Sequence, residues 1–116
     1  FEYKTIAWVW LKITRQGVPH IGMGYWTRQC TEICLLGTRG TPPAPAYRAE
    51  PALIVAPRGK KHSQKPMEQY AKIDRLWPNL YPRLEMFARE VQPGWDGFGN
   101  ELTDGISISL PSLEEV

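Results

Sequence analysis

The sequence predicts an α/β fold with a mixed sheet and flanking helices. Residues 5–13 are almost continuously apolar and rich in β-branched and aromatic side chains, which is typical of a strand covered on both faces. Residues 52–56, 67–77 and 84–88 then follow the pattern strand, helix, strand. Because this spacing suits a right-handed βαβ unit, the last two strands are expected to be parallel neighbours.

Local patterns predict the remaining elements. Residues 16–24 contain three glycines and a proline, which indicates a long loop, and residues 32–36 form a second apolar strand. The prolines of residues 41–47 indicate a surface excursion. The helix at 67–77 should begin after Pro66 and end at Pro78, with an i,i+4 pair and an apolar face. The pair is Glu68 with Lys72, and the apolar face is Met67, Tyr70, Ala71, Ile73 and Trp77.

The length of 116 residues suits one small domain or a part of a larger one. We expect a single domain over residues 1–104 and a loosely ordered C-terminal tail over residues 105–116. There is no apolar run of the ~20 residues that a membrane span needs and no signal peptide, so a cytoplasmic protein without a membrane partner is expected. The chain opens on Phe1 and its first methionine is Met23, which favours a piece of a longer reading frame or a processed chain.

No metal site and no familiar catalytic constellation are predicted. Cys30 and Cys34 cannot complete a zinc site alone, and His20 lies outside the usual ligand spacing, so two reduced thiols are expected. The sequence contains no G-x-G-x-x-G, Walker or H-E-x-x-H motif and no Ser-His-Asp arrangement. His20 itself is more typical of a solvent-facing loop residue than of a catalytic one.

Residues 83–102 form an apolar strand that runs into a glycine-rich loop. Glu85 and Arg89 flank the end of the strand, and Asn100 and Glu101 close the loop with acceptors suited to sugar hydroxyls. Two interpretations stay open at this point. The stretch is either the edge at which an α/β sheet presents a ligand, or an ordinary strand followed by a flexible turn.

A basic loop spans residues 57–66 and carries Arg58, Lys60, Lys61, His62 and Lys65. Such a loop can neutralise phosphates, although most charge runs are simply solvated. Lys65 stands directly ahead of the predicted helix, where a fixed cation suits the carboxylate or phosphate of a small molecule. The formal net charge of +2 is too small to decide the partner by itself.

Four ordered blocks resemble a known family. They are G-Y-W-T-R-Q-C-T-E-I-C-L-L-G-T-R-G at 24–40, L-I-V-A-P-R at 53–58, H-S-Q-K-P-M-E-Q-Y at 62–70, and L-E-M-F-A-R with G-W-D-G-F-G-N-E within 84–101. Together they resemble the C-terminal half of an N(6)-adenine methyltransferase. That family includes the catalytic subunit of the eukaryotic messenger-RNA adenosine methyltransferase. The sequence is more similar to the bacterial and phage DNA-modifying members, and the resemblance extends to about Asp104.

The resemblance implies a partial Rossmann-like sheet that binds S-adenosylmethionine, with residues 1–104 as the C-terminal portion of one methyltransferase domain. It implies that Lys65 binds the methionine carboxylate and that Arg89 and Asn100 hold the ribose. Glu101 stands where some relatives have an amide and can accept ribose hydroxyls, while Glu85 matches the acidic residue of its strand. The basic loop and the G-Y-W block resemble segments that border the target nucleotide. They supply six candidate contacts to nucleic acid, DNA rather than RNA: Arg58, Lys60, Lys61, His62, Trp26 and Arg28.

Two departures from the family pattern limit these implications. Glu90 runs straight into Val91, where the RNA enzymes carry an extra polar pair used on the adenine ring of the cofactor. The D-P-P-W motif, which holds the flipped adenine in the family, is absent and would precede Phe1. We therefore expect no catalytic residue here and no turnover without an N-terminal half or a complementing chain. The alternatives are a non-catalytic nucleic-acid-binding pseudoenzyme subunit, which the cofactor-site matches disfavour, and an inactive truncated remnant.

Overall fold

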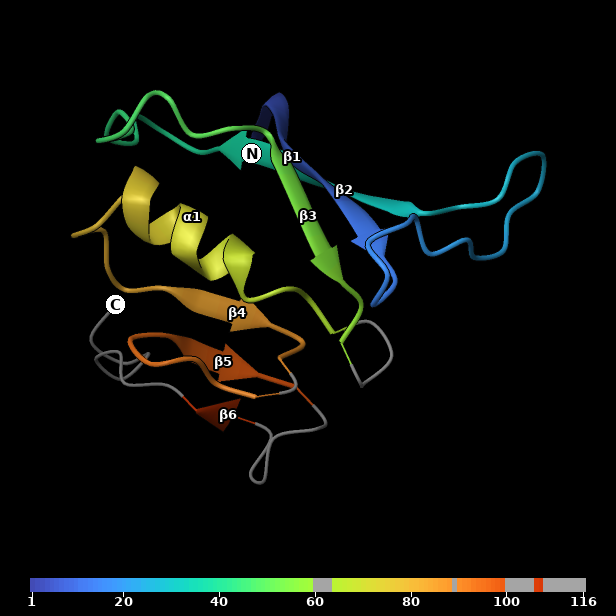
Figure 1. Cartoon of the computed structure of the whole chain (residues 1–116). Helices are drawn as coiled ribbons and strands as arrows, with labels where there is room; N and C mark the ends of the chain where they lie inside the picture. Colours follow the sequence, from blue (N-terminus) through green and yellow to red (C-terminus); the bar gives the residue numbers. More distant parts are fainter. Residues whose placement is uncertain (60–63, 89, 100–105, 108–116) are drawn as a thin grey trace. The chain divides into compact units, whose positions relative to one another are not determined.

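A computed structural model describes residues 1–59, 64–88, 90–99 and 106–107 of the chain. The chain divides into two compact units, Phe1–Pro78 and Asn79–Val116, and each contains a three-stranded sheet with both parallel and antiparallel pairing (Figure 1). The predicted α/β class with mixed pairing is confirmed. In the described part of the chain, no helix is both long enough and apolar enough to cross a membrane.

The sheet of the first unit has the order β2-β1-β3. Its strands are β1 (Glu2–Ile13), β2 (Thr31–Thr38) and β3 (Leu53–Pro57), each close to a predicted strand. β1 lies between an antiparallel partner, β2, and a parallel partner, β3. The chain between β1 and β2 projects beyond the ends of these strands (Figure 1); we call residues 14–30 the arm.

One face of this sheet carries the core of the unit. Trp8 and Trp10 of β1 are buried against Ile54 and Ala56 of β3, and the helix α1 (Glu68–Leu76) packs on this cluster through apolar side chains that include Ile73. The indole Nε1 of Trp10 donates a hydrogen bond to the carbonyl oxygen of Ala56 at 2.9 Å. Because the indole is both packed and hydrogen-bonded, it fixes β1 against β3 under the start of the helix.

The opposite face of the same sheet is solvent-exposed. Val9 lies beside Ile33 and Leu53 in the strand register, and Leu11 lies beside Val55. Ile33, Leu53 and Val55 are each more than half exposed. The expectation that the first strand is covered on both faces is therefore wrong for the described residues, none of which buries this apolar face.

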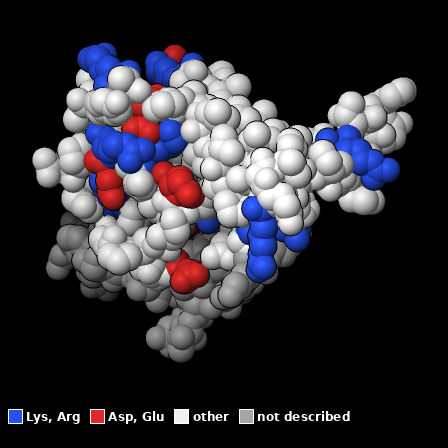
Figure 2. Space-filling model, in the orientation of Figure 1, with Lys and Arg blue, Asp and Glu red and all other residues white. Residues whose placement is uncertain are grey.

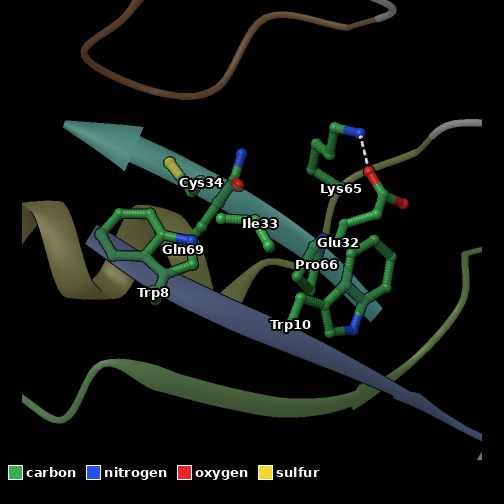
Figure 3. Close-up of a pocket in the computed structure, with 8 residues that line it drawn as sticks. All are labelled: Trp8, Trp10, Glu32, Ile33, Cys34, Lys65, Pro66 and Gln69. Carbon is green, nitrogen blue, oxygen red and sulfur yellow. Dashed lines mark hydrogen bonds and ion pairs between the residues drawn. The ribbon is translucent and has the colours of Figure 1, made fainter. Parts of the chain in front are cut away.

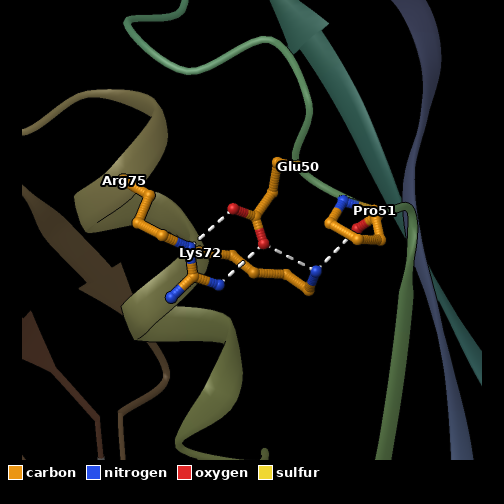
Figure 4. A network of polar contacts seen from close by, with 4 residues as sticks. All are labelled: Glu50, Pro51, Lys72 and Arg75. Atoms are coloured by element: carbon orange, nitrogen blue, oxygen red, sulfur yellow. Dashed lines mark hydrogen bonds and ion pairs between the residues drawn. The ribbon is translucent and has the colours of Figure 1, made fainter.

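The helix is held by an ion-pair network that differs from the predicted one. Lys72 is buried, and its Nζ lies 2.8 Å from Glu50 Oε1 and 2.6 Å from the carbonyl oxygen of Pro51, rather than pairing with Glu68 (Figure 4). Arg75 reaches the same carboxylate from the next turn, with Nε 2.6 Å from Oε2. The predicted apolar face is correct at Ile73, whereas Met67 and Ala71 are exposed.

The second unit has the strand order β4-β5-β6. β4 (Leu84–Met86) pairs in parallel with β5 (Asp96–Phe98), which pairs antiparallel with β6 (Ile106–Ser107). The parallel partner of β3 is β1 and that of β4 is β5, so the predicted pairing of the strands at 52–56 and 84–88 is not found. Part of the expected glycine-rich loop is strand β5, and the segment expected to be a loose tail supplies β6.

β4 ends two residues earlier than predicted because Phe87 has a φ of 59°, in the left-handed region. The chain then returns to the sheet at buried Ala88, whose N–H donates to the Phe98 carbonyl oxygen at 2.7 Å. Gly99 lies directly against Ala88, and a Cβ there would collide with its backbone. This close approach explains a glycine that the sequence pattern attributed to a flexible loop.

Candidate functional site

A pocket of about 160 Å³ opens where α1 meets the sheet of the first unit (Figure 3). β1 supplies two indole walls, β2 supplies a carboxylate and a thiol, and the segment that leads into α1 supplies a lysine ammonium. The lining residues are Trp8, Trp10, Glu32, Ile33, Cys34, Lys65, Pro66 and Gln69. The pocket therefore combines flat apolar walls with one anion and one cation, the composition of a small-molecule site.

Glu32 is the polar centre of this pocket. Its two carboxylate oxygens lie 2.6 Å from the ammonium groups of Lys12 and Lys65, one on each oxygen. The Lys12 ammonium also lies 5.2 Å from the centre of the Trp10 ring. Burial acts to raise the pKa of Glu32, but the two ammonium groups outweigh it and the pKa is lowered. Glu32 is therefore ionised at neutral pH and fixes the direction of the Lys65 side chain.

Lys65 keeps part of its surface free for a ligand. Its side chain is 42% exposed, although its Nζ is bound to Glu32. An ammonium has three donors, so this group can donate a hydrogen bond to the carboxylate of a ligand while it stays paired with Glu32. Cys34 lines the same pocket, and burial raises the pKa of its thiol, which keeps the thiol protonated.

A second, larger cavity of about 410 Å³ lies between α1, β1 and β2. Its walls are mostly apolar and include Ile6, Leu36, Leu76 and Trp77. It shares Trp8, Cys34 and Gln69 with the first pocket but does not include Lys65. It lacks the cation that distinguishes the first pocket.

The predicted cofactor-site residues fall into separate parts of the structure. Lys65 lines the pocket of the first unit, and Glu85 lies half-buried in β4 opposite Gly97 of β5 in the second unit. Arg89, Asn100 and Glu101 lie outside the described residues.

The predicted nucleic-acid contacts are also divided. Trp26 and Arg28 are exposed on the arm, and Arg58 is exposed just after β3. Lys60, Lys61 and His62 lie outside the residues that the structure describes. Figure 2 shows arginine atoms, without Asp or Glu atoms, on the projecting arm, which contains no lysine.

Sequence reasoning missed Glu32 and the two tryptophans as pocket residues, and it missed Lys12 as a partner of Glu32. A signal for Glu32 was available, because a carboxylate at the start of an apolar strand requires a partner when it is partly buried. The partners could not be found in the same way, since Lys12 pairs through the β1–β2 register and Lys65 lies 33 positions away.

The fold is that of an α/β protein with a charged pocket beside its helix, and comparison with known proteins shows the class. The profile of the MT-A70 family matches residues 2–101. The chain belongs to the MT-A70 family, whose fold is that of S-adenosylmethionine-dependent methyltransferases, as the resemblance predicted.

Individual relatives agree with this assignment. The chain is 35% identical to the Type II methyltransferase M.MunI of Mycoplasma sp, over 100% of this chain and 46% of that protein. It is 35% identical to the N(6)-adenosine-methyltransferase catalytic subunit METTL3 of Homo sapiens, over 90% of this chain and 18% of that protein. A third relative is the N6-methyladenosine RNA methyltransferase MTA1 of Cryphonectria parasitica, with 35% identity over 82% of this chain and 27% of that protein. The chain thus spans less than half the length of these relatives.

Proposed function

We propose that the chain forms the cofactor-binding C-terminal part of a methyltransferase that acts on the N6 amino group of adenine in nucleic acid. The family match over residues 2–101 carries this proposal. Relatives named for adenosine N6 methylation and a relative named as a type II methyltransferase both support it. We favour DNA as the polymer because the sequence blocks resemble the bacterial and phage members, and the Mycoplasma relative aligns over the whole chain.

The side chains in the pocket fit S-adenosylmethionine. The Lys65 ammonium would hold the methionine carboxylate, and the Trp8 and Trp10 rings border the space beside it. By the resemblance, Arg89, Asn100 and Glu101 would hold the ribose of the cofactor, and Glu85 matches the acidic residue of its strand. When bound, the cofactor would supply an electrophilic methyl group for transfer to the adenine amino nitrogen. Glu32 sets the direction of the Lys65 side chain, 2.6 Å from its carboxylate, and competes with the carboxylate of the cofactor for the same ammonium.

Transfer itself requires a group that presents the adenine. In the family this is the D-P-P-W motif, and residues 1–116 contain no D-P-P sequence. We therefore propose that this chain binds the methyl donor but does not turn over alone.

Methyl transfer should be absent from the chain alone. The measurement is the incorporation of tritiated methyl groups from S-adenosylmethionine into an adenine-containing oligonucleotide. It compares the chain alone with a polypeptide in which the D-P-P-W segment of a relative precedes Phe1. We expect incorporation only in the second case, because in-line attack needs a positioned adenine. Turnover by the chain alone at an ordinary enzymatic rate would contradict the proposal.

The basic loop should contribute a salt-dependent part of nucleic-acid binding. Replacing Lys60 and Lys61 by alanine should flatten the slope of log affinity against log salt by about two units if both side chains contact phosphates. The control is Lys4→Ala, which removes an exposed lysine that pairs with Glu2 at 3.2 Å near the start of β1. Equal slopes for the double variant and the unmodified chain would show that the loop is only solvated.

A further inference from the structure

We propose that the tip of the arm, residues 23–28, is a stacking platform for an unpaired nucleic-acid base. The proposal rests on the proposed function for the nature of the polymer, and it adds that the polymer is contacted where its bases are unpaired. Four properties of the arm support it: an ordered backbone, required glycines, exposed aromatic rings and the absence of acidic side chains.

Backbone hydrogen bonds hold the arm in a defined shape. At its base, Lys12 N donates to the Cys30 carbonyl oxygen at 2.9 Å, and His20 N donates to the Lys12 carbonyl oxygen at 2.8 Å. The tip is closed by a second pair of bonds, Gly22 N to Gln29 O at 2.7 Å and Gln29 N to Met23 O at 3.0 Å. The six residues of the tip are thus presented on a closed loop and not on a free segment.

Two glycines make this loop possible. A Cβ on Gly24 would collide with the carbonyl oxygen of Thr27, and a Cβ on Gly22 would lie 2.9 Å from the carbonyl oxygen of Gln29. The two sides of the tip therefore approach more closely than side chains would allow.

The side chains of the tip are unusually exposed for their type. Met23, Tyr25 and Trp26 are 82%, 92% and 88% exposed. The rings of Tyr25 and Trp26 meet edge to face, with centroids 5.6 Å apart and planes at 89°. This contact fixes the two rings relative to each other and leaves most of their surface in solvent. Large apolar groups held in solvent on an ordered loop indicate an interaction site.

The charge of the arm identifies the partner as an anion. Residues 14–31 contain no aspartate or glutamate, and Arg15 and Arg28 are both exposed. Cations that flank accessible aromatic rings match a polymer with phosphates and flat bases. In a perfect duplex the faces of the bases are stacked on one another, so only an unpaired base can offer its face to Trp26.

The test compares three labelled probes by fluorescence anisotropy: a 15-nucleotide single strand, its perfect duplex, and the same duplex with one bulged adenine. Trp26→Ala should weaken binding of the single strand and of the bulged duplex at least about fivefold, the effect of losing one stacked base. Binding of the perfect duplex should change less than about twofold. Trp26→Phe should retain most of the affinity, because it keeps an aromatic face.

Two further variants separate stacking from other effects. Gly24→Ala keeps every aromatic and basic side chain but forces the tip to open, so it should weaken single-strand binding as Trp26→Ala does. Tyr3→Ala removes an exposed tyrosine near the start of β1, at the other end of that strand from the arm, and should leave all three affinities unchanged. Circular dichroism spectra that match the unmodified chain establish that each variant is folded.

Several results would overturn the inference. One is that Trp26→Ala binds the single strand as tightly as the unmodified chain does. Another is that Trp26→Ala loses the same affinity for all three probes. A third is that Trp26→Ala loses self-association, measured by sedimentation, but keeps its affinity for nucleic acid. The last result would identify the tip as a protein contact. Titration of S-adenosylhomocysteine into the same variants keeps the two proposals apart: unchanged cofactor binding by Trp26→Ala is expected if the proposed function holds, whether or not the tip stacks a base.

Discussion

Replacing Glu50 by glutamine should lower the free energy of unfolding of the first unit by roughly 3–5 kcal/mol, the cost of breaking a buried ion pair by removing one partner. The carboxylate lies 2.8 Å from the buried Lys72 ammonium and 2.6 Å from Arg75, and both interactions join α1 to the segment before β3. Its loss leaves the Lys72 cation buried without a counter-charge. Urea unfolding followed by tryptophan fluorescence measures the change, because Trp8 and Trp10 are buried beneath the helix.

Two comparisons test the reason for this loss. Glu68→Gln removes an exposed carboxylate from the first turn of the same helix and should change stability by less than about 0.5 kcal/mol. Glu50→Gln combined with Lys72→Met removes the stranded cation together with its partner, and it should recover part of the lost stability. A single Glu50→Gln variant as stable as the Glu68→Gln control would show that the network contributes nothing.

The same carboxylate predicts a pH dependence. Hydrogen bonds from Arg75 and Lys72 lower the pKa of Glu50 from 4.5 to about 2. Because the folded-state pKa is depressed, the stabilisation is complete above about pH 4.5 and is lost as the pH falls towards 2. The stability difference between the unmodified chain and Glu50→Gln should therefore shrink across this window.

Lys65→Ala should weaken the binding of S-adenosylhomocysteine at least tenfold, because a carboxylate would lose its charged partner. A ligand that lacks the carboxylate, 5′-methylthioadenosine, should bind both proteins equally. Glu32→Gln should act in the opposite direction, since it releases Lys65 and removes a negative charge from beside the incoming carboxylate. Because Glu32 and Lys65 are partly exposed, the gain in the binding free energy of S-adenosylhomocysteine should be about 0.2–1 kcal/mol, or up to about fivefold in affinity. Equal losses of both ligands in Lys65→Ala would show that this lysine supports the pocket wall and not the carboxylate.

The periodicity of the sequence was sufficient to predict the helix and the strands that have a local pattern of their own. The apolar run before Thr14, the run at 52–56 and the helix between Pro66 and Pro78 all lie within a few residues of their predicted bounds. The end of β4 at Phe87 could not be predicted, because nothing in the local sequence indicates a left-handed φ at a bulky apolar residue. The pairing of β4 with β5 depends on the close approach of Gly97 and Gly99 to Ala88, which only the folded chain shows.

The candidate site was predictable to a smaller extent. Lys65 was recognised because it directly precedes a helix, a position that can be read from the sequence. Its partner Glu32 and the indole walls come together only through the register of β1 with β2. Lys72 illustrates the same limit: its i,i+4 spacing to Glu68 predicted a surface pair, whereas burial made Glu50, which lies outside the helix, its partner.

Titration of S-adenosylhomocysteine into the unmodified chain tests most directly whether these residues form the cofactor-binding part of a methyltransferase. We predict saturable binding to one site per chain, measured by calorimetry, with the Lys65→Ala isotherm strongly weakened under the same conditions. No heat of binding to a folded chain, or an isotherm that Lys65→Ala leaves unchanged, would contradict the assignment of the pocket.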